Sequence, residues 1–467
     1  MVLSRIWSAF IIVAILVASI KYLFSPNYKS IYNDMVVGKG GDTVSIANLP
    51  ISKIPASAHD ALLKSENFDD GSIHYKTDSL KEKVKIYRIQ STDGVIGTSD
   101  TAVKICLGLI GIMTLFMGFM TIAEKAGGIN LLSRMIQPFF SKLFPEIPKN
   151  HPSFGHMMLN FSANLLGLDN AATPFGLKAM ESLQTLNPST ERASNAQIMF
   201  LCLHASGLTL IPVSIIAIRA SMKASNPTDI FLPCLIATFA ATMAAMIIVS
   251  IKQKINLFQP VVLAYVGGIS AIIAALVVFL VRLNQEELGE FSKVLSNGII
   301  LFIFFAIVLG AIYKKIDVFG SFIEGAKDGF WTSVKIIPYL VGMLIAISLL
   351  RTSGVFEVII DGMKWLATAA NLDTRFVGGL PTALIKPLSG SGARGMMVDT
   401  MTTFGPDSFP SKLAGILQGS SDTTFYVIAV YFGAVAIKNT RYTVGAMLLA
   451  DLVGIITSII LAYLFFG

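Results

Sequence analysis

The chain has 467 residues, of which 54% are hydrophobic and only 14% are charged. Soluble domains carry about 25% charged residues, so this composition, with a mean hydropathy of +0.68, excludes a soluble domain and indicates an all-α polytopic membrane protein. The net charge of +7 does not predict nucleic-acid binding, because the basic residues gather between apolar segments, as loops that flank a membrane require.

The N-terminal part combines an apolar segment with a polar region. Ile6–Phe24 is either a signal peptide or an uncleaved membrane anchor, and we favour the anchor because Lys21 and Tyr22 follow as they would at an interface. From about residue 25 to residue 100 the chain is polar, and "KVKIYRIQ" alternates as a strand does. We expect a small exposed module here, with His59 and His74 as surface residues and not metal ligands.

The remaining apolar stretches predict further membrane spans, because a bilayer core of ~30 Å needs roughly 20 apolar residues. The expected spans are Val103–Ile122, Ser153–Leu168, Gln197–Ile218, Ile230–Ile251, Val261–Leu283, Ile299–Tyr313, Val334–Leu350, Phe376–Leu388, Leu413–Ile437 and Thr443–Phe466. Three amphipathic stretches are expected to lie along the membrane interface: Ile129–Phe144, Phe319–Trp331 and Val355–Ala369.

The two halves of the chain repeat the same order of elements. "AVKICLGLIG" at Ala102 corresponds to "SVKIIPYLVG" at Ser333, and each is followed by an amphipathic segment. A broken element then follows, "LLGLDNAATPFGLKAM" in one half and "IKPLSGSGARGMMVDT" in the other, and after it a span with polar residues, "FLCLHASGLTLIP" or "GILQGSSDTTFYV". Internal repeats of this kind are typical of secondary transporters.

Charge distribution favours inverted repeats over parallel ones. If each broken element is a re-entrant hairpin, the linking span inverts the second half and places Lys252, Lys254, Lys314 and Lys315 in the cytoplasm, in accord with the positive-inside rule. Arg219 then belongs to the basic residues that flank the membrane outside. The parallel alternative, in which each broken element spans the membrane, puts the four lysines outside.

These observations divide the chain into five parts. They are an N-terminal membrane anchor helix (1–24), an extracytoplasmic polar insertion (25–100), a first repeat (101–255), a linking transmembrane helix (256–290) and a second repeat (291–467).

Polar residues at membrane depth are costly, so they are candidates for binding. In the first half we expect a helix to break near Leu168 and restart with Asn170 or Thr173 as cap. The candidate binding residues of this half are Asn164, Asp169, Asn170, Thr173, His204, Ser206 and Thr209, with Asn160 and Ser162 beside them. The alternatives are that Asp169 and Asn170 only cap their own helix and that His204 is a satisfied core histidine and not a proton carrier.

The second half offers two polar motifs. "SGSGARG" presents backbone N–H groups at a helix start, as phosphate-binding nests do, and the Gly-Lys-Ser/Thr ending of a P-loop is absent. "QGSSDTT" is the densest polar run inside an apolar span. We expect its Asp422 to have one of three roles: an ion pair with Arg394 or Lys386, a ligand to Na⁺, or a carrier of a proton. The candidate residues are Lys386, Ser389, Ser391, Arg394, Gln418, Ser420, Ser421, Asp422 and Thr423, with Asp451 as a weaker one. The alternatives are glycine packing, a snorkelling Lys386 and a purely structural hydrogen-bond network.

No motif of a known enzyme class is present. The chain lacks Gly-x-Ser-x-Gly, His-Glu-x-x-His and Walker motifs. Its cysteines, Cys106, Cys202 and Cys234, have no metal-binding spacing. We therefore expect no enzyme activity, no catalytic residues, no metal and no cofactor beyond a coupling Na⁺ or H⁺.

At these motifs the sequence resembles a fusion of spore maturation proteins A and B. The A-like part carries "GLIGIMTLFMGFMTIAEKAG" and "NLLGLDNAATPFGLKAM", with Phe116 where a tryptophan is expected. The B-like part carries "IKPLSGSGARG", "FGPDSF" and "GSSDTTFYVIAVYFG". The resemblance implies a Gate, or nucleoside recognition, domain in each half, so that 101–255 is the A-like Gate repeat and 291–467 the B-like one. Only the name of that domain implies nucleosides as the transported solute, and no residue of the sequence does so by itself.

Together these predictions describe a multi-pass protein of the bacterial inner membrane. We expect a secondary transporter or permease for a small polar solute, which Arg394, Lys386 and the helix starts bias towards negative charge. The alternative is a non-transporting scaffold for envelope assembly, with residues 25–100 as the docking module for an extracytoplasmic protein. The partners are the lipid bilayer and the solute, and a homo-oligomer is left open.

Overall fold

The computed structural model describes residues 2–467 apart from short gaps. Outside the description lie residues 52–53, 55–57, 60–61, 63–66, 71–72, 78–82, 149–150, 166–168, 206 and 284, and only the backbone is described for residues 2–6, 39–49, 68–70, 73, 88–93, 169–171 and 285–286. The chain forms two compact units whose boundaries fall inside helices. The first unit holds Met1–Ile105, Ile337–Pro381 and Arg394–Ala414, and the second unit holds Cys106–Ile336, Thr382–Ala393 and Gly415–Gly467.

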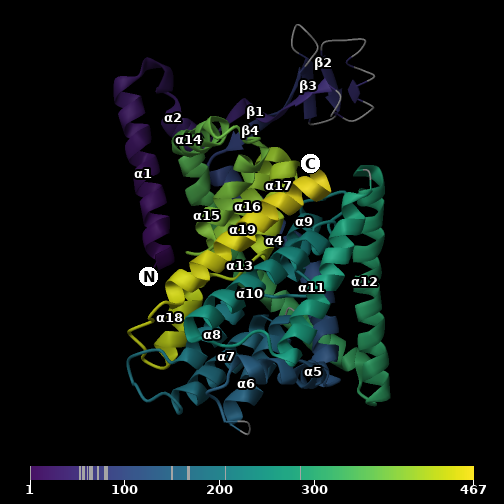
Figure 1. Cartoon of the computed structure of the whole chain (residues 1–467). Helices are drawn as coiled ribbons and strands as arrows, with labels where there is room; N and C mark the ends of the chain where they lie inside the picture. Colours follow the sequence, from purple (N-terminus) through teal and green to yellow (C-terminus); the bar gives the residue numbers. More distant parts are fainter. Residues whose placement is uncertain are drawn as a thin grey trace. The chain divides into compact units, whose positions relative to one another are not determined.

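Long apolar helices dominate the described part of the chain, as Figure 1 shows. Among the described residues, seven helices are long and apolar enough to cross a membrane. They are α1 (Val2–Phe24), α4 (Val95–Lys125), α10 (Phe231–Gln253), α11 (Pro260–Val281), α12 (Gln285–Tyr313), α13 (Val318–Thr352) and α19 (Thr443–Phe466). The predicted all-α polytopic membrane fold is confirmed.

The polar region of the first unit folds into an antiparallel sheet, after the short helices η1 (Pro26–Tyr28) and α2 (Ile31–Val36). Its strands are β1 (Gly38–Pro50), β2 (Asn67–Asp70), β3 (Ile73–Thr77) and β4 (Lys83–Asp93), in the order β1-β4-β3-β2. Val84 and Ile86 of β4 are buried while Lys83 and Lys85 are exposed, as the alternation of a strand requires. With Tyr75 they form a small core of their own, so the predicted strand in "KVKIYRIQ" is confirmed.

The chain enters and leaves this sheet at one point. Gly38, the first residue of β1, pairs with Asp93, the last residue of β4. The backbones are so close that a Cβ atom on Gly94 would lie 2.5 Å from the Gly38 nitrogen. The sheet is therefore an insertion whose two ends are adjacent.

Helix α1 is held in the first unit by side-chain bonds to the C-terminal part of α13 and to the residue that follows it. Trp7 Nε1 donates to the Gly342 carbonyl at 2.8 Å, and Lys21 Nζ donates to the Ser353 carbonyl at 2.7 Å. After α13 come α14 (Val355–Ala369) and the short helix η3 (Arg375–Gly379). Lys21, the basic residue expected at an interface, thus donates a hydrogen bond to a carbonyl group at the C-terminal end of α13.

The second unit is a helical bundle. After the C-terminal part of α4 it contains α5 (Gly128–Leu143), α6 (Pro152–Leu165), α7 (Asp169–Gln184), α8 (Asn195–Ala205) and α9 (Val213–Ser221). Helices α6 and α7 form a hairpin, and α10 packs along both α19 and α8. Every side chain of α8 from Gln197 to Ala205 is buried, so this helix lies at the centre of the unit.

The order of elements repeats along the chain. The series α4, α5, α6, α7, α8, α9 and α10 recurs as α13, α14, α15 (Leu380–Ile385), α16 (Gly390–Phe404), α17 (Phe409–Gly419), α18 (Thr424–Ala434) and α19. Both amphipathic helices, α5 and α14, follow a glycine in the left-handed conformation, with φ of 82° at Gly127 and 77° at Gly354. The predicted repeat is confirmed at the level of elements, whereas the inverted orientation of the halves stays a prediction.

Four expected spans are wrong, and two of these are each divided into two short helices. Gln197–Ile218 is split into α8 and α9, and Leu413–Ile437 is split into α17 and α18. Gly207, with a φ of 62°, breaks the first segment, and Pro212 precedes the restart of the helix. The other two, Ser153–Leu168 and Phe376–Leu388, are wrong because their helices are short. Helix α6 has 14 residues and α15 has 6, too few to cross a bilayer alone, as the re-entrant hairpin hypothesis requires.

The expected interfacial helix Phe319–Trp331 is also wrong, since these residues form the beginning of the continuous helix α13. Its glycines permit close packing on α4 within the second unit. A Cβ atom on Gly325 would lie 2.3 Å from the Met117 carbonyl oxygen, and one on Gly329 would lie 2.5 Å from the Met113 carbonyl oxygen. The apparent amphipathic pattern therefore reflects a helix–helix contact.

Candidate functional site

The two broken helices of the second unit meet at their breaks. The Asp422 amide, between α17 and α18, donates to the carbonyl of Ala205, the last residue of α8, at 2.7 Å. Gly207 packs directly against this bond, because a Cβ atom there would lie 3.3 Å from the Asp422 nitrogen. Since each break leaves backbone groups outside the helical hydrogen-bond pattern, this contact places polar backbone from both repeats side by side.

Replacing Gly207 with alanine tests this backbone contact. We expect Gly207→Ala to lower stability by about 1–2 kcal/mol, because its φ of 62° is unfavourable for other residues and the new methyl group presses on Asp422. The thermal midpoint of the purified protein in detergent measures the change. Gly155→Ala in α6 is the matched control, because nothing lies within 4 Å of its added Cβ. Equal midpoints for the two variants would contradict the prediction.

The end of α15 joins the same place. The Phe425 amide donates to the Pro387 carbonyl at 2.9 Å, and Lys386 Nζ donates to the Gln418 carbonyl at 2.7 Å. Gln418 lies in the last turn of α17, where carbonyl groups carry partial negative charge. The buried Lys386 ammonium group is thus oriented towards a helix C-terminus, not snorkelling to an interface.

The glycine-rich motif forms a capped helix start. Helix α16 begins at Gly390, and the Gly392 amide donates to Ser389 Oγ at 3.0 Å. The Ser389 and Ser391 hydroxyls lie 3.3 Å apart. Ser389 therefore acts as the N-cap, and a Cβ atom on Gly390 would lie only 2.7 Å from Thr423 Oγ1, which brings this helix start against the α17–α18 break.

His204 links the first hairpin to Asp422. Asn160 donates its Nδ2 to the Ala172 carbonyl at 2.6 Å, which leaves its Oδ1 to accept from His204 Nδ1 at 3.0 Å. The Asn164 side-chain amide lies 2.8 Å from the same Nδ1, and its oxygen faces the ring when Nδ1 carries the proton. The other ring nitrogen, Nε2, therefore faces Asp422, 3.9 Å from Oδ2. A histidine in this arrangement forms an ion pair with the carboxylate when it takes up a proton.

Asp422 combines a fixed backbone with an accessible carboxylate. Its side chain is 45% exposed, although the His204 side chain opposite is 4% exposed. The Thr423 amide donates to Asp422 Oδ1 at 2.7 Å, which leaves Oδ2 towards His204. This is an arrangement that can bind a cation or exchange a proton.

Thr424 and Tyr431, which lie outside the predicted set, contribute to this site. Thr424 Oγ1 donates to Asp451 Oδ2 of α19 at 2.6 Å, in a buried position, so the weaker candidate Asp451 supports the α18 start. The Tyr431 ring of α18 packs edge-on against His204, with centroids 4.8 Å apart. An aspartate inside an apolar helix was a visible signal, whereas nothing in the sequence marked Tyr431 among the other aromatic residues.

The other predicted site residues fall into three groups. Thr209 Oγ1 bonds to the Gly207 carbonyl at 2.9 Å, and Ser420 Oγ bonds to the Leu417 carbonyl at 3.0 Å, so both stabilise the breaks. Helix α7 begins at Asp169, so Asn170 and Thr173 lie within it and the prediction that one of them caps this helix is wrong. Ser421 lies in the α17–α18 break. Ser206, and the side chains of Asp169 and Asn170 at the start of α7, lie outside the described residues.

Arg394 belongs to the first unit, so its part in the site stays a prediction. The carboxylate of Asp399 in the same unit forms an ion pair with Arg351.

The comparisons with known proteins find a family that matches the chain in two segments. The family described as Gate, nucleoside recognition, matches residues 106–222 and 333–438. Spore maturation protein B of Bacillus subtilis (strain 168) is 46% identical over 178 residues, which are 38% of this chain and 98% of that protein. Spore maturation protein A of the same organism is 42% identical over 156 residues, 33% of this chain and 80% of that protein. No solved structure gives a significant match.

The two relatives are consistent with a fused chain. Nearly the whole of one relative and most of the other align with parts of a single chain, and the Gate family matches it in two separate segments. The predicted resemblance to a fused A and B protein is thus confirmed, and the spans identify a multi-pass membrane protein. The chain belongs to the family of the spore maturation proteins A and B and carries two Gate segments in one polypeptide.

Proposed function

We propose that the protein is a secondary transporter or permease of the bacterial inner membrane for a small polar solute, coupled to H⁺ or Na⁺. The observation that carries the proposal is the contact of the two broken helices at Ala205 and Asp422. Secondary transporters build their sites in this way, from interrupted helices whose unwound backbone binds ions and substrate.

The surrounding groups support coupling to an ion. The accessible Asp422 carboxylate faces His204 Nε2 at 3.9 Å, which suits a proton shared between the two. The backbone carbonyls and the hydroxyls of Ser421 and Thr423 offer oxygen ligands to Na⁺ as the alternative. Lys386 and the α16 start add positive character, which favours an anionic or strongly polar solute.

Uptake into proteoliposomes tests the proposal. The protein is reconstituted and supplied with radiolabelled solutes, nucleosides first because of the family's description, under separate proton and sodium gradients. Accumulation that one gradient drives and its collapse abolishes supports the proposal. Protein-free liposomes are the control, and the absence of gradient-dependent uptake for nucleosides, nucleotides and small organic anions would count against it.

A second candidate function, a membrane scaffold, is favoured by the inserted sheet. The sheet has its own core and is joined to the rest of the first unit at adjacent ends. It therefore has the character of a docking module for an extracytoplasmic partner.

Excising the sheet separates the two functions. Because Gly38 pairs with Asp93, residues 39–92 can be replaced by a short Gly-Ser linker with little strain. We expect the shortened protein to keep its solute uptake within about twofold, since linkers of this kind are tolerated where chain ends are adjacent. Loss of uptake from a protein that still elutes as a single species would contradict this, and loss of a co-purifying partner would favour the scaffold.

A further inference from the structure

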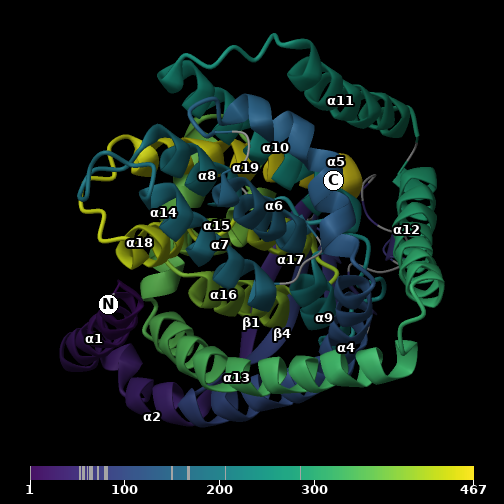
Figure 2. The same cartoon turned by 90° about the horizontal axis from the view of Figure 1, so that it is seen from below.

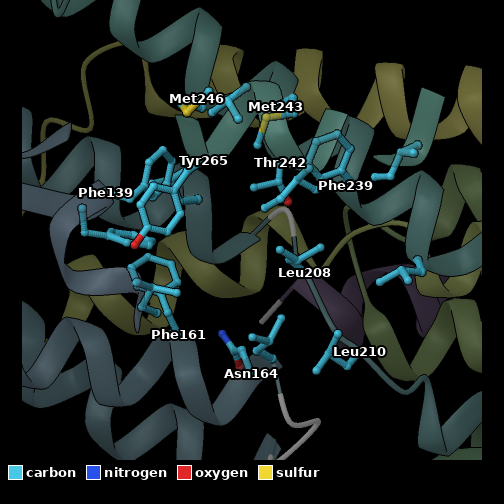
Figure 3. A pocket seen from close by; sticks show the side chains of 18 of the residues that line it. Phe139, Phe161, Asn164, Leu208, Leu210, Phe239, Thr242, Met243, Met246 and Tyr265 are labelled. Carbon is cyan, nitrogen blue, oxygen red and sulfur yellow. The ribbon is translucent and has the colours of Figure 1, made fainter. Parts of the chain in front are cut away.

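A large cavity in the second unit adjoins the site but differs from it chemically. It has a volume of about 420 Å³ and lies among α5, α6, α8, α10 and α11, a size typical of ligand pockets. Figure 3 shows Phe139, Phe161, Phe239 and Met243 around it, with Asn164 at one end. Nearly all of its wall is made of aliphatic, aromatic and methionine side chains.

The few polar side chains on the wall are already hydrogen-bonded within the protein. Thr242 Oγ1 donates to a carbonyl one turn earlier in α10 at 2.7 Å, and Tyr265 Oη donates to a carbonyl of α5 at 2.6 Å. Asn164 and His204 contact each other at 2.8 Å. A polar occupant would therefore find few free partners, whereas a hydrocarbon needs none.

The position of the cavity indicates where its occupant comes from. Two of its walls, α10 and α11, are helices able to cross a membrane. Helix α11 contacts α5 at the edge of this unit (Figure 2), and of its side chains only Val262 and Leu280 are buried. Ile272, which lines the cavity, is itself largely exposed. A cavity bounded by such a helix faces the acyl chains of the bilayer.

We propose that this cavity binds one hydrocarbon chain of a membrane lipid, which enters beside α11. The inner end of the chain contacts His204 and Leu208, next to the break that meets Asp422. The lipid thereby fills space that would otherwise weaken the packing around the broken helix α8–α9. This inference concerns a bound lipid and not the transported solute, and its test does not depend on uptake.

Photo-crosslinking in vesicles tests the proposal directly. The full chain is reconstituted in phosphatidylethanolamine and phosphatidylglycerol vesicles that contain a trace of phospholipid with a diazirine near the end of one acyl chain. After illumination, we expect cross-linked peptides to concentrate at Phe239, Met243 and Leu208, and unlabelled phospholipid to compete. Labelling confined to outward-facing residues of α11 and α12 would overturn the proposal.

A pair of tryptophan variants on α11 provides the matched control. Ile269 lines the cavity and is 45% exposed, whereas Leu263 does not line it and is 48% exposed. Ile269→Trp is expected to reduce the cavity labelling at least about fivefold, because the indole occupies the space of the chain, and Leu263→Trp to leave it unchanged. If Ile269→Trp fails to fold, Ile269→Phe takes its place. Unchanged labelling in a folded variant with the bulkier residue at position 269 would overturn the proposal.

Discussion

Asp422→Asn is expected to abolish gradient-driven accumulation of the solute in proteoliposomes. The asparagine side chain keeps an oxygen atom that can accept the hydrogen bond from the Thr423 backbone amide, which in the native protein is 2.7 Å from Asp422 Oδ1. The α17–α18 break should therefore fold as before. It cannot form the charged pair with His204, whose Nε2 lies 3.9 Å from Oδ2. Without the carboxylate the coupling ion loses its charged site, so the initial rate of gradient-driven uptake should fall at least about tenfold.

Solute exchange distinguishes loss of coupling from loss of binding. If Asp422 carries the coupling ion, Asp422→Asn should retain exchange of labelled for unlabelled solute across the membrane while accumulation disappears. Asp361→Asn is the control, because Asp361 is exposed on α14 and its partner Lys364 lies 4.0 Å away. Wild-type accumulation by Asp422→Asn would remove this carboxylate from the mechanism.

Arg219→Leu is expected to destabilise the protein by about 3–5 kcal/mol, the cost of leaving one member of a buried ion pair alone. The Arg219 side chain is 0% exposed, its Nη2 lies 3.0 Å from Asp229 Oδ1, and it also donates to the Asn226 carbonyl at 3.2 Å. The pair connects the last turn of α9 to the residues before α10. The variant should show a much lower thermal midpoint in detergent, or should fail to accumulate.

Removing both charges should restore much of this loss. In Arg219→Leu/Asp229→Leu no unpaired charge remains buried, so we expect a midpoint well above that of Arg219→Leu. Arg282→Leu, at an exposed position after α11, should have little effect. A double variant no more stable than Arg219→Leu would show that packing of the arginine side chain, not its charge, matters at this position.

The sequence predicted the long helices well because hydrocarbon thickness imposes length and composition on them. It predicted the repeat because the same order of apolar, amphipathic and broken segments occurs twice. It failed where a helix was continuous or interrupted for tertiary reasons. The beginning of α13 continues into a long helix and packs its glycines on α4, whereas α8 ends where Gly207 takes a left-handed conformation against Asp422.

The sequence predicted which residues form the candidate site better than it predicted which of them are in contact. The polar run around Asp422 and the histidine at 204 were evident as polar groups in apolar segments. Their proximity was not, since it depends on the Asp422 amide reaching the Ala205 carbonyl across more than two hundred residues of sequence. The burial of Arg219 was also not evident: the charge pattern counted it among the residues that flank the membrane outside, and that position stays a prediction. The structure adds that its side chain is completely buried and that Asp229 lies beside it.

The inserted sheet also has a practical consequence for imaging the protein. Small membrane proteins with little mass outside the detergent micelle are difficult to align in electron micrographs. Because the backbones at Gly38 and Asp93 are paired, a rigid globular protein with adjacent termini could replace the sheet at this position. Such a chimera would carry an asymmetric marker fixed by two connections, and an antibody fragment raised against the native sheet would serve the same purpose without altering the chain.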